Sequence, residues 1–281
     1  MLAFDIYYFY RQCKHYKKVF TNISSRDFKI INDDKFQIMQ LKNMDINSFL
    51  FIDEYEQKKD DNTKNALTLY LFGILIERNN ITNIENQISE LLKGCNKTKV
   101  HAVKDYKNIH VREYLSSGFT NLIDKNKLIL LGFAFQKNRS KYYITNYKLK
   151  YSDIDLTNYR SLALILFIHK INEYIKKNNE HLGLCRIIVA EDWLKRNKMI
   201  IHEGMVLNNI ENIYSDIPKN APPLVLSDHF GYIFGKIKRH YDKIGLNLME
   251  YLKLNTIPKT ELFYLEQIIK LNKNNLFHFL E

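Results

Sequence analysis

Two apolar runs near the start of the chain set the strongest limit on its fold. Residues 48–55 form a compact apolar run that leads into acidic residues, and residues 67–77 form a second run rich in β-branched and aromatic side chains. The intervening residues 57–65 are charged and polar, as expected of a loop between hairpin strands. The pattern predicts two paired strands, so the fold must contain a sheet.

Strands and helices alternate along the rest of the chain. Thr82 and Glu85 have the spacing of a capping box, and they open an amphipathic stretch that runs through Leu92 and stops at Gly94. Apolar residues also recur at helical spacing over residues 158–178. Further helices are expected at residues 109–125, 203–214, 224–241 and 260–280, and further strands at residues 127–136, 142–147 and 184–190. This order predicts an α/β fold in which a mixed β-sheet is flanked by helices.

The chain divides into a short addition and one core domain. With 281 residues, 46% of them hydrophobic, it can bury a substantial core. Residues 1–46 are rich in tyrosine and lysine and form an N-terminal addition, in which residues 3–10 and 16–23 could pair as a β-hairpin. Residues 47–281 contain no internal repeat and no low-complexity linker. We therefore expect them to form a single core that ends in a C-terminal helix.

The charge balance favours a polyanionic partner. Lysine and arginine exceed aspartate and glutamate by 42 to 31, a formal net charge of +11. This surplus must lie on the surface, because unpaired cationic groups are rarely buried. Nucleic acid is the simplest phosphate-rich partner, although a genome of biased base composition also produces lysine-rich proteins.

The cysteines and the apolar runs indicate where in the cell the protein is expected. Cys13, Cys95 and Cys185 lie far apart and form neither a disulfide framework nor a C-x-x-C metal site, which fits reduced thiols in a cytoplasm. The N-terminal stretch lacks the features of a secretion signal. The longest apolar runs are shorter than the roughly 20 residues that cross a bilayer, so we expect a cytoplasmic protein that does not span a membrane.

Acidic residues stand where an open sheet would form a binding crevice. Asp53 and Glu54 follow one apolar run, and Glu191 and Asp192 follow another. Such acids border a shared crevice when they lie at the carboxyl ends of parallel strands. Asp228 lies within an apolar helical stretch, where an ionised carboxylate needs a partner. Any single strand-end acid is more often a turn or cap residue than a catalytic one.

Several converging carboxylates would form a metal site. Two carboxylates about 4 Å apart repel by about 4 kcal/mol at intermediate dielectric unless a cation neutralises them. Oxygen ligands suit Mg²⁺ or Mn²⁺, and pairs of such ions hold the attacking and leaving oxygens in phosphodiester cleavage. The expected catalytic residues are Asp53, Asp192 and Asp228, and the expected metal ligands are Asp53, Glu54, Glu191, Asp192 and Asp228. No phosphate-binding glycine loop and no serine or cysteine nucleophile elbow offers a competing chemistry.

Three basic clusters could bind a phosphate backbone. They cover residues 97–104, 137–141 and 236–243, each with tyrosine or histidine nearby. Lysine and arginine can follow the phosphates while aromatic rings stack on bases. The candidate nucleic-acid-binding residues are Lys99, Lys104, Lys137, Arg139, Lys236, Lys238 and Arg239. Each cluster taken alone could also be an ordinary solvated charged face.

Several segments together resemble one protein family. Phe51 to Glu56 reads F-I-D-E-Y-E and matches the first three conserved positions of an I-D-E-S-G-like signature, and Pro223 to Asp228 resembles a P-L-Q-L-A-D element. Between them, Lys99, Val100 and His101 stand at an E-L-H or E-L-K element without its acid. These segments resemble the bacterial and phage family catalogued as domain of unknown function thirty-eight hundred, over roughly residues 48–241.

This resemblance implies a ribonuclease-H-like sheet and a metal-dependent nuclease. It places the metal-binding acids on Asp53, on Glu191 or Asp192, and on Asp228, with Asp105 as a substitute for the missing middle acid. Two alternatives stay open. The chain could be a non-catalytic nucleic-acid- or protein-binding module that kept the fold, or Asp5 in the apolar run 2–9 could supply the first-strand acid in place of Asp53.

Overall fold

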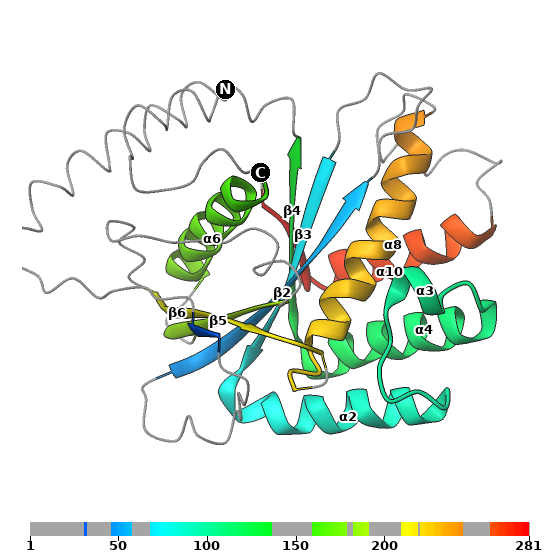
Figure 1. Ribbon diagram of the computed structural model, residues 1–281, viewed down its shortest axis with the longest axis horizontal. Helices are drawn as coiled ribbons and strands as arrows, with labels where there is room; N and C mark the ends of the chain where they lie inside the picture. Colours follow the sequence, from blue (N-terminus) through cyan, green and yellow to red (C-terminus); the bar gives the residue numbers. More distant parts are fainter. Residues whose placement is uncertain are drawn as a thin grey trace, which may run out of the picture.

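The fold is a sheet with helices on both faces (Figure 1). The computed structural model describes residues 31–32, 46–57, 68–136, 159–178, 182–190, 209–218, 220–243 and 259–280. Within these residues no helix is both long enough and apolar enough to span a membrane. The possible N-terminal hairpin, the expected strand at 142–147 and Asp5 lie outside them, so these expectations and the domain boundary after residue 46 stay predictions.

Seven strands form one mixed sheet in the order β1-β6-β5-β2-β3-β4-β7. β2, β3 and β4 form an antiparallel meander, while β5 pairs with β2, and β6 with β5, in parallel. Short parallel strands β1 and β7 complete the two edges. The strands cover Ile31–Asn32 (β1), Ile46–Gln57 (β2), Thr68–Glu77 (β3), Ile129–Gln136 (β4), Leu184–Ala190 (β5), Ile210–Asp216 (β6) and Phe277–Phe279 (β7).

Helices cover both faces of the sheet. α6 (Tyr159–Asn178) lies on one face, while α8 (Leu224–Lys243) packs on β2 and β3 from the other (Figure 1). With α8 lie α2 (Ile81–Gly94), α3 (Ala102–Asp105), α4 (Ile109–Asn126) and α10 (Lys259–Lys273), and a 3₁₀ turn at Arg78–Asn80 leads into α2. This arrangement confirms the predicted α/β class, a mixed β-sheet flanked by helices.

Alternation along the central strand explains the two hydrophobic cores. Phe49 and Phe51 of β2 lie in the core under α8, while Leu50 and Ile52 lie in the core under α6. Successive side chains of a strand point to opposite faces, so an apolar run without polar interruption is what a strand covered on both faces requires. The early apolar runs therefore became the two central strands, β2 and β3, paired as expected.

Residues 210–216 form a strand, so the prediction of a helix over 203–214 is wrong for this segment. Ile210 and Ile213, three residues apart, both lie in the core under α6. A register irregularity allows this, since Cys185 pairs with Ile210 but Arg186 pairs with Asn212. The extra residue of the bulge puts side chains at helical spacing on one face of a strand.

Two further expectations differ from the structure. The last helix ends at Lys273 rather than at 280, because Asn275 adopts a left-handed conformation (φ 56°) that turns the chain into β7. The capping box of Thr82 and Glu85 does not form. The preceding 3₁₀ turn brings α2 in at Ile81, so Thr82 lies inside the helix.

Candidate functional site

Helix α8 lies directly on the central strand β2. The Ser227 hydroxyl donates a buried hydrogen bond to the Phe51 carbonyl oxygen at 2.6 Å. One turn later, a Cβ atom placed on Gly231 would lie 3.3 Å from Cβ of Tyr55, and one on Gly235 would overlap the Tyr55 ring. The two glycines thus allow the close approach of helix and sheet that the sequence suggested.

Two parallel strands, β5 and β6, end beside β2 beneath α8, while β2 itself continues to Gln57. Asp53 therefore lies within its strand and not at the strand end that the sequence predicted. Ile52 pairs with Val189, so Asp53 comes next to Ala190, which in turn pairs with Asp216 at the end of β6. Asp53 follows Phe51 by two residues and therefore points to the α8 side. Ala190 belongs to the same core, and so the row that runs from Asp53 to Asp216 faces α8. Two strand spacings separate the two acids, about 10 Å between backbones.

Each acid of this row accepts a hydrogen bond from the backbone N–H of the residue that follows it. The Asp53 carboxylate accepts a hydrogen bond from the backbone N–H of Glu54 at 2.7 Å. The buried Asp216 carboxylate accepts one from Ile217 N–H at 2.7 Å and one from the Asn220 side chain at 3.0 Å. Asp216 was not among the sequence candidates, because its segment was predicted as helix. As a strand, this segment ends in an acid, Asp216.

Asp228 finds its partners in α3 and the residue before it. One carboxylate oxygen accepts a hydrogen bond from the backbone N–H of Ala102 at 2.8 Å and lies 3.4 Å from Nδ1 of His101. Only 13% of the Asp228 side chain is exposed. The interaction with Asp228 raises the pKa of His101, and it does so against the opposing effect of burial. The sequence predicted that this carboxylate needs a partner, and the structure shows that the partner is Ala102, 126 residues away.

Asp105 stabilises α3. Its carboxylate accepts hydrogen bonds from Lys97 and from the backbone N–H of His101, both at 2.8 Å. Burial acts to raise the pKa of Asp105, but these two hydrogen bonds outweigh it and lower the pKa below its ordinary value. Val100, at the element that lacks its acid, is buried in the core. These two hydrogen bonds of Asp105 therefore stabilise the segment around α3.

A buried pair behind Asp228 joins α3 to α8. Nδ1 of His229 and the Tyr106 hydroxyl share a hydrogen bond, and both side chains are almost fully buried. Burial lowers the pKa of His229 to about 3 and raises that of Tyr106, so both groups stay neutral at neutral pH. The packing role that the sequence suggested for His229 agrees with this environment.

Glu54 lies on the opposite face of the sheet from Asp53. Arg160, at the start of α6, forms ion pairs with Glu54 at 3.1 Å and with Glu56, and the Tyr159 hydroxyl donates to Glu56 at 2.9 Å. The structure therefore places Glu54 with Arg160 and not with the carboxylates under α8. These contacts join the end of β2 to the start of α6.

The other predicted residues fall into two groups. Glu191, Asp192, Lys137 and Arg139 lie outside the described residues, as do the side chains of Lys238 and Arg239 on α8. Glu191 follows the last residue of β5 directly. Lys99, just before α3, and Lys104, within it, are exposed, and the Lys236 ammonium lies 5.3 Å from the centre of the Tyr232 ring. Among the described residues, no three His, Cys, Asp or Glu side chains are placed to hold a metal ion.

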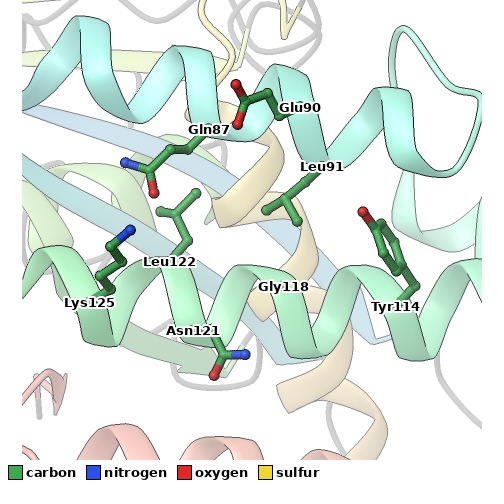
Figure 2. Close-up of a pocket in the computed structure, with 8 residues that line it drawn as sticks. All are labelled: Gln87, Glu90, Leu91, Tyr114, Gly118, Asn121, Leu122 and Lys125. Carbon is green, nitrogen blue, oxygen red and sulfur yellow. The ribbon is translucent and has the colours of Figure 1, made fainter.

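A separate open groove lies between α2 and α4 (Figure 2). Its volume is about 410 Å³. Leu91 and Leu122 line its middle, with Gln87 and Lys125 toward one end and Tyr114 at the other (Figure 2). None of the predicted metal-binding or nucleic-acid-binding residues lines this groove. The candidate site is therefore the region under α8 that contains Asp53 and Asp216, and not this groove.

Comparisons with known proteins add a weak likeness of fold. No protein-family model and no curated protein matches the chain. A solved structure of Bst-RNase HIII in complex with Mn²⁺ is 11% identical, with 93% of this chain and 81% of that chain covered and a TM-score of 0.36. A mutant of Bst-RNase HIII is 11% identical, with 94% and 79% covered and a TM-score of 0.34. At this level the likeness carries no argument about activity.

Proposed function

We propose that this chain is a divalent-metal-dependent phosphodiesterase that acts on DNA or RNA, with Asp53, Asp192 and Asp228 as its catalytic carboxylates. One observation carries the proposal. Asp53 lies on the α8 face of β2, and Asp228 belongs to the helix that packs on this strand, next to Ser227, which bonds the Phe51 carbonyl. Glu191 and Asp192 come directly after Ala190 in the sequence, and Ala190 lies next to Asp53 in register.

The donor chemistry of these carboxylates fits a hard cation. Carboxylate oxygens are ligands that Mg²⁺ and Mn²⁺ prefer, and none of the proposed ligands is a thiolate or an imidazole. A bound ion would polarise the phosphate and lower the pKa of a water molecule that attacks phosphorus. The proposed ligands are Asp53, Glu191, Asp192 and Asp228, while the contacts of Glu54 with Arg160 favour a structural role for that residue.

Other residues of the described chain would support metal and substrate binding. The backbone N–H of Ala102 fixes one carboxylate oxygen of Asp228. Asp216, two strands from Asp53 on the same face, adds negative charge that favours cation binding. The surplus of basic residues elsewhere on the surface would hold the polyanionic substrate.

A second function rests on the segment that contains α3. In the family that the sequence resembles, an acid stands where this chain has Lys99 and Val100, and Asp105 is bound to Lys97 and to the N–H of His101. These contacts favour a non-catalytic nucleic-acid-binding module that kept the fold. Both functions fit the cytoplasmic location that the sequence predicts.

A cleavage assay separates the two functions. Purified protein is incubated with labelled single- and double-stranded DNA and RNA in Mg²⁺, Mn²⁺ or EDTA. The nuclease proposal expects products only with metal, and at least a 100-fold lower rate in Asp53→Asn and Asp228→Asn. The control is Asp124→Asn, which removes an acid that contacts Lys127 and Lys270 far from the site. Salt-dependent binding without metal-dependent products would select the binding module, and cleavage unchanged in Asp228→Asn would reject the catalytic assignment.

A further inference from the structure

A basic, partly apolar surface extends outward from Asp228. We call residues 93–114 the α3 arm, because they run from the end of α2 through α3 into α4. The arm carries six lysine and arginine side chains against two acids, Asp105 and Glu113. The six are Lys93, Lys97, Lys99, Lys104, Lys107 and Arg112. Positive charge is therefore concentrated beside the carboxylate site.

Three of the lysines project from the arm without a local counter-charge. Lys97 is engaged with Asp105 at 2.8 Å. Lys99, Lys104 and Lys107 are exposed, and none of the three forms an ion pair within the described part of the chain. They are thus available for phosphate groups, and each contact with a phosphate would release condensed counterions from the nucleic acid.

Apolar side chains are exposed among these lysines. Val103 is 50% exposed, Ile109 49% and Tyr114 45%, and the only other large hydrophobic residues of the described chain that are comparably exposed are Leu262 and Phe279. A duplex hides its bases and presents phosphates and sugars, whereas a single strand presents unstacked bases together with its phosphates. A surface that alternates ammonium groups with apolar side chains matches the single strand.

The arm is held rigidly next to the site. Tyr106 is buried and bonds His229, and the Ala102 N–H bonds Asp228 at 2.8 Å. A surface fixed before binding loses less conformational entropy when its ligand docks. A strand lying on Lys104 and Val103 would pass within a residue or two of the contact between α3 and Asp228.

We propose that the α3 arm is the docking surface for single-stranded nucleic acid, with Lys99, Lys104 and Lys107 on the phosphates and Val103 and Ile109 against the bases. The inference rests on the proposed function only for the polyanionic nature of the partner. It adds the strand state of that partner and the element that guides it to the carboxylates. It requires no catalytic turnover, so binding and cleavage can be tested apart.

The test measures binding alone. Fluorescence anisotropy with the full chain in EDTA records the affinity for a labelled 20-nucleotide single strand, as DNA and as RNA, and for a duplex of the same sequence. The KCl concentration is varied to obtain the slope of log K against log salt. We expect tighter binding of single strands than of duplex. The triple variant Lys99→Ala, Lys104→Ala, Lys107→Ala should bind at least 10-fold more weakly, with a slope smaller by about 2, since each phosphate contact contributes about 0.7.

Two further variants separate charge from base contact. Lys170→Ala, Lys176→Ala, Lys177→Ala removes the same charge from α6, on the other face of the sheet, and should leave affinity within about 2-fold of wild type and the slope unchanged. Val103→Ser with Ile109→Ser should weaken single-strand binding about 5-fold with an unchanged slope and leave duplex binding unaltered. If the triple lysine variant fails to fold, Lys104→Ala alone should lower the slope by about 0.7.

The outcomes distinguish this inference from the proposed function. A wild-type slope in the triple lysine variant, or an equal loss in the α6 control, overturns the assignment to the α3 arm even where metal-dependent cleavage persists. Equal affinity for duplex and single strand overturns the strand preference. Arm-dependent binding in a protein that cleaves nothing supports this inference and contradicts the nuclease proposal, whereas wild-type protein that binds no nucleic acid contradicts both.

Discussion

Asp228 and Ala102, 126 residues apart, are joined by a 2.8 Å hydrogen bond from the Ala102 backbone N–H to the Asp228 carboxylate. Asp228 therefore fixes α3, and it is also proposed as a catalytic carboxylate with Asp53. A catalytic test of Asp228 must therefore separate loss of chemistry from loss of structure.

Replacing Asp228 by alanine and by asparagine makes this separation. Alanine leaves the Ala102 N–H without its acceptor, and we expect a loss of about 1–2 kcal/mol in the free energy of unfolding. Asparagine keeps a carbonyl acceptor and should cost less than half of that. Urea unfolding measures both. Metal-dependent cleavage should be lost equally in the two variants, whereas cleavage that follows stability would assign Asp228 a structural role only.

The approach of α8 to β2 is tested by Gly235 and Tyr55. Gly235→Ala places a methyl group into the Tyr55 ring and should destabilise the protein by about 1–3 kcal/mol. In a Tyr55→Ala background the methyl group fits, so the same substitution should stabilise by up to about 1 kcal/mol through helix propensity. Gly231→Ala is the matched control, with its nearest neighbour at 3.3 Å and a small net effect. Chemical denaturation of the four proteins gives the coupling, and additive effects would contradict this packing.

The buried His229 should make the free energy of unfolding depend on pH. Its pKa falls from 6.5 to about 3 because it is buried, so between these values the unfolded chain binds a proton that the folded chain does not. This contribution is complete above pH 6.5, and stability should fall as pH drops from 6.5 toward 3, by at most about 1.4 kcal/mol per pH unit. Urea unfolding at several pH values should show a shallower fall in His229→Phe, Tyr106→Phe. Parallel curves for the two proteins would mean that His229 titrates normally in the folded state.

The double variant also tests the hydrogen bond itself. Tyr106→Phe alone leaves Nδ1 of His229 buried without its partner and should cost about 1–3 kcal/mol. Replacing both members by phenylalanine removes both polar groups together and should cost less than the single change, provided that the rings pack equally well. Thermal or urea unfolding of the two single variants and the double variant completes the cycle.

Local pattern was enough to predict most of the framework. The runs that became β2 and β3, the long helix α6 and the strand β5 were all expected close to their observed bounds, since an apolar run or a helical stripe of this length favours one structure. The close packing of α8 on the sheet was also predictable, because Gly231 and Gly235 lie on one helical face with Asp228. These features depend on neighbours in sequence and are visible there.

Contacts between distant segments were not predictable in this way. No pattern near Asp228 in the sequence predicts that Ala102 and His101 are its partners. The bulge in β6 gave Ile210 and Ile213 a helical spacing, and the misread segment concealed Asp216. In each case the deciding interaction comes from a segment far along the chain or from an irregularity that periodicity does not encode.

Location of a bound cation tests the central claim most directly. Crystals grown or soaked with Mn²⁺ are measured for anomalous scattering. We expect a peak under α8, between β2 and α8, about 2.0–2.3 Å from carboxylate oxygens of both Asp53 and Asp228. The Asp228→Asn variant, prepared in the same way, should lose or weaken it. A fully ordered site without an anomalous peak at saturating Mn²⁺, or carboxylates of Asp53 and Asp228 directed into separate regions of solvent, would contradict the proposed metal centre.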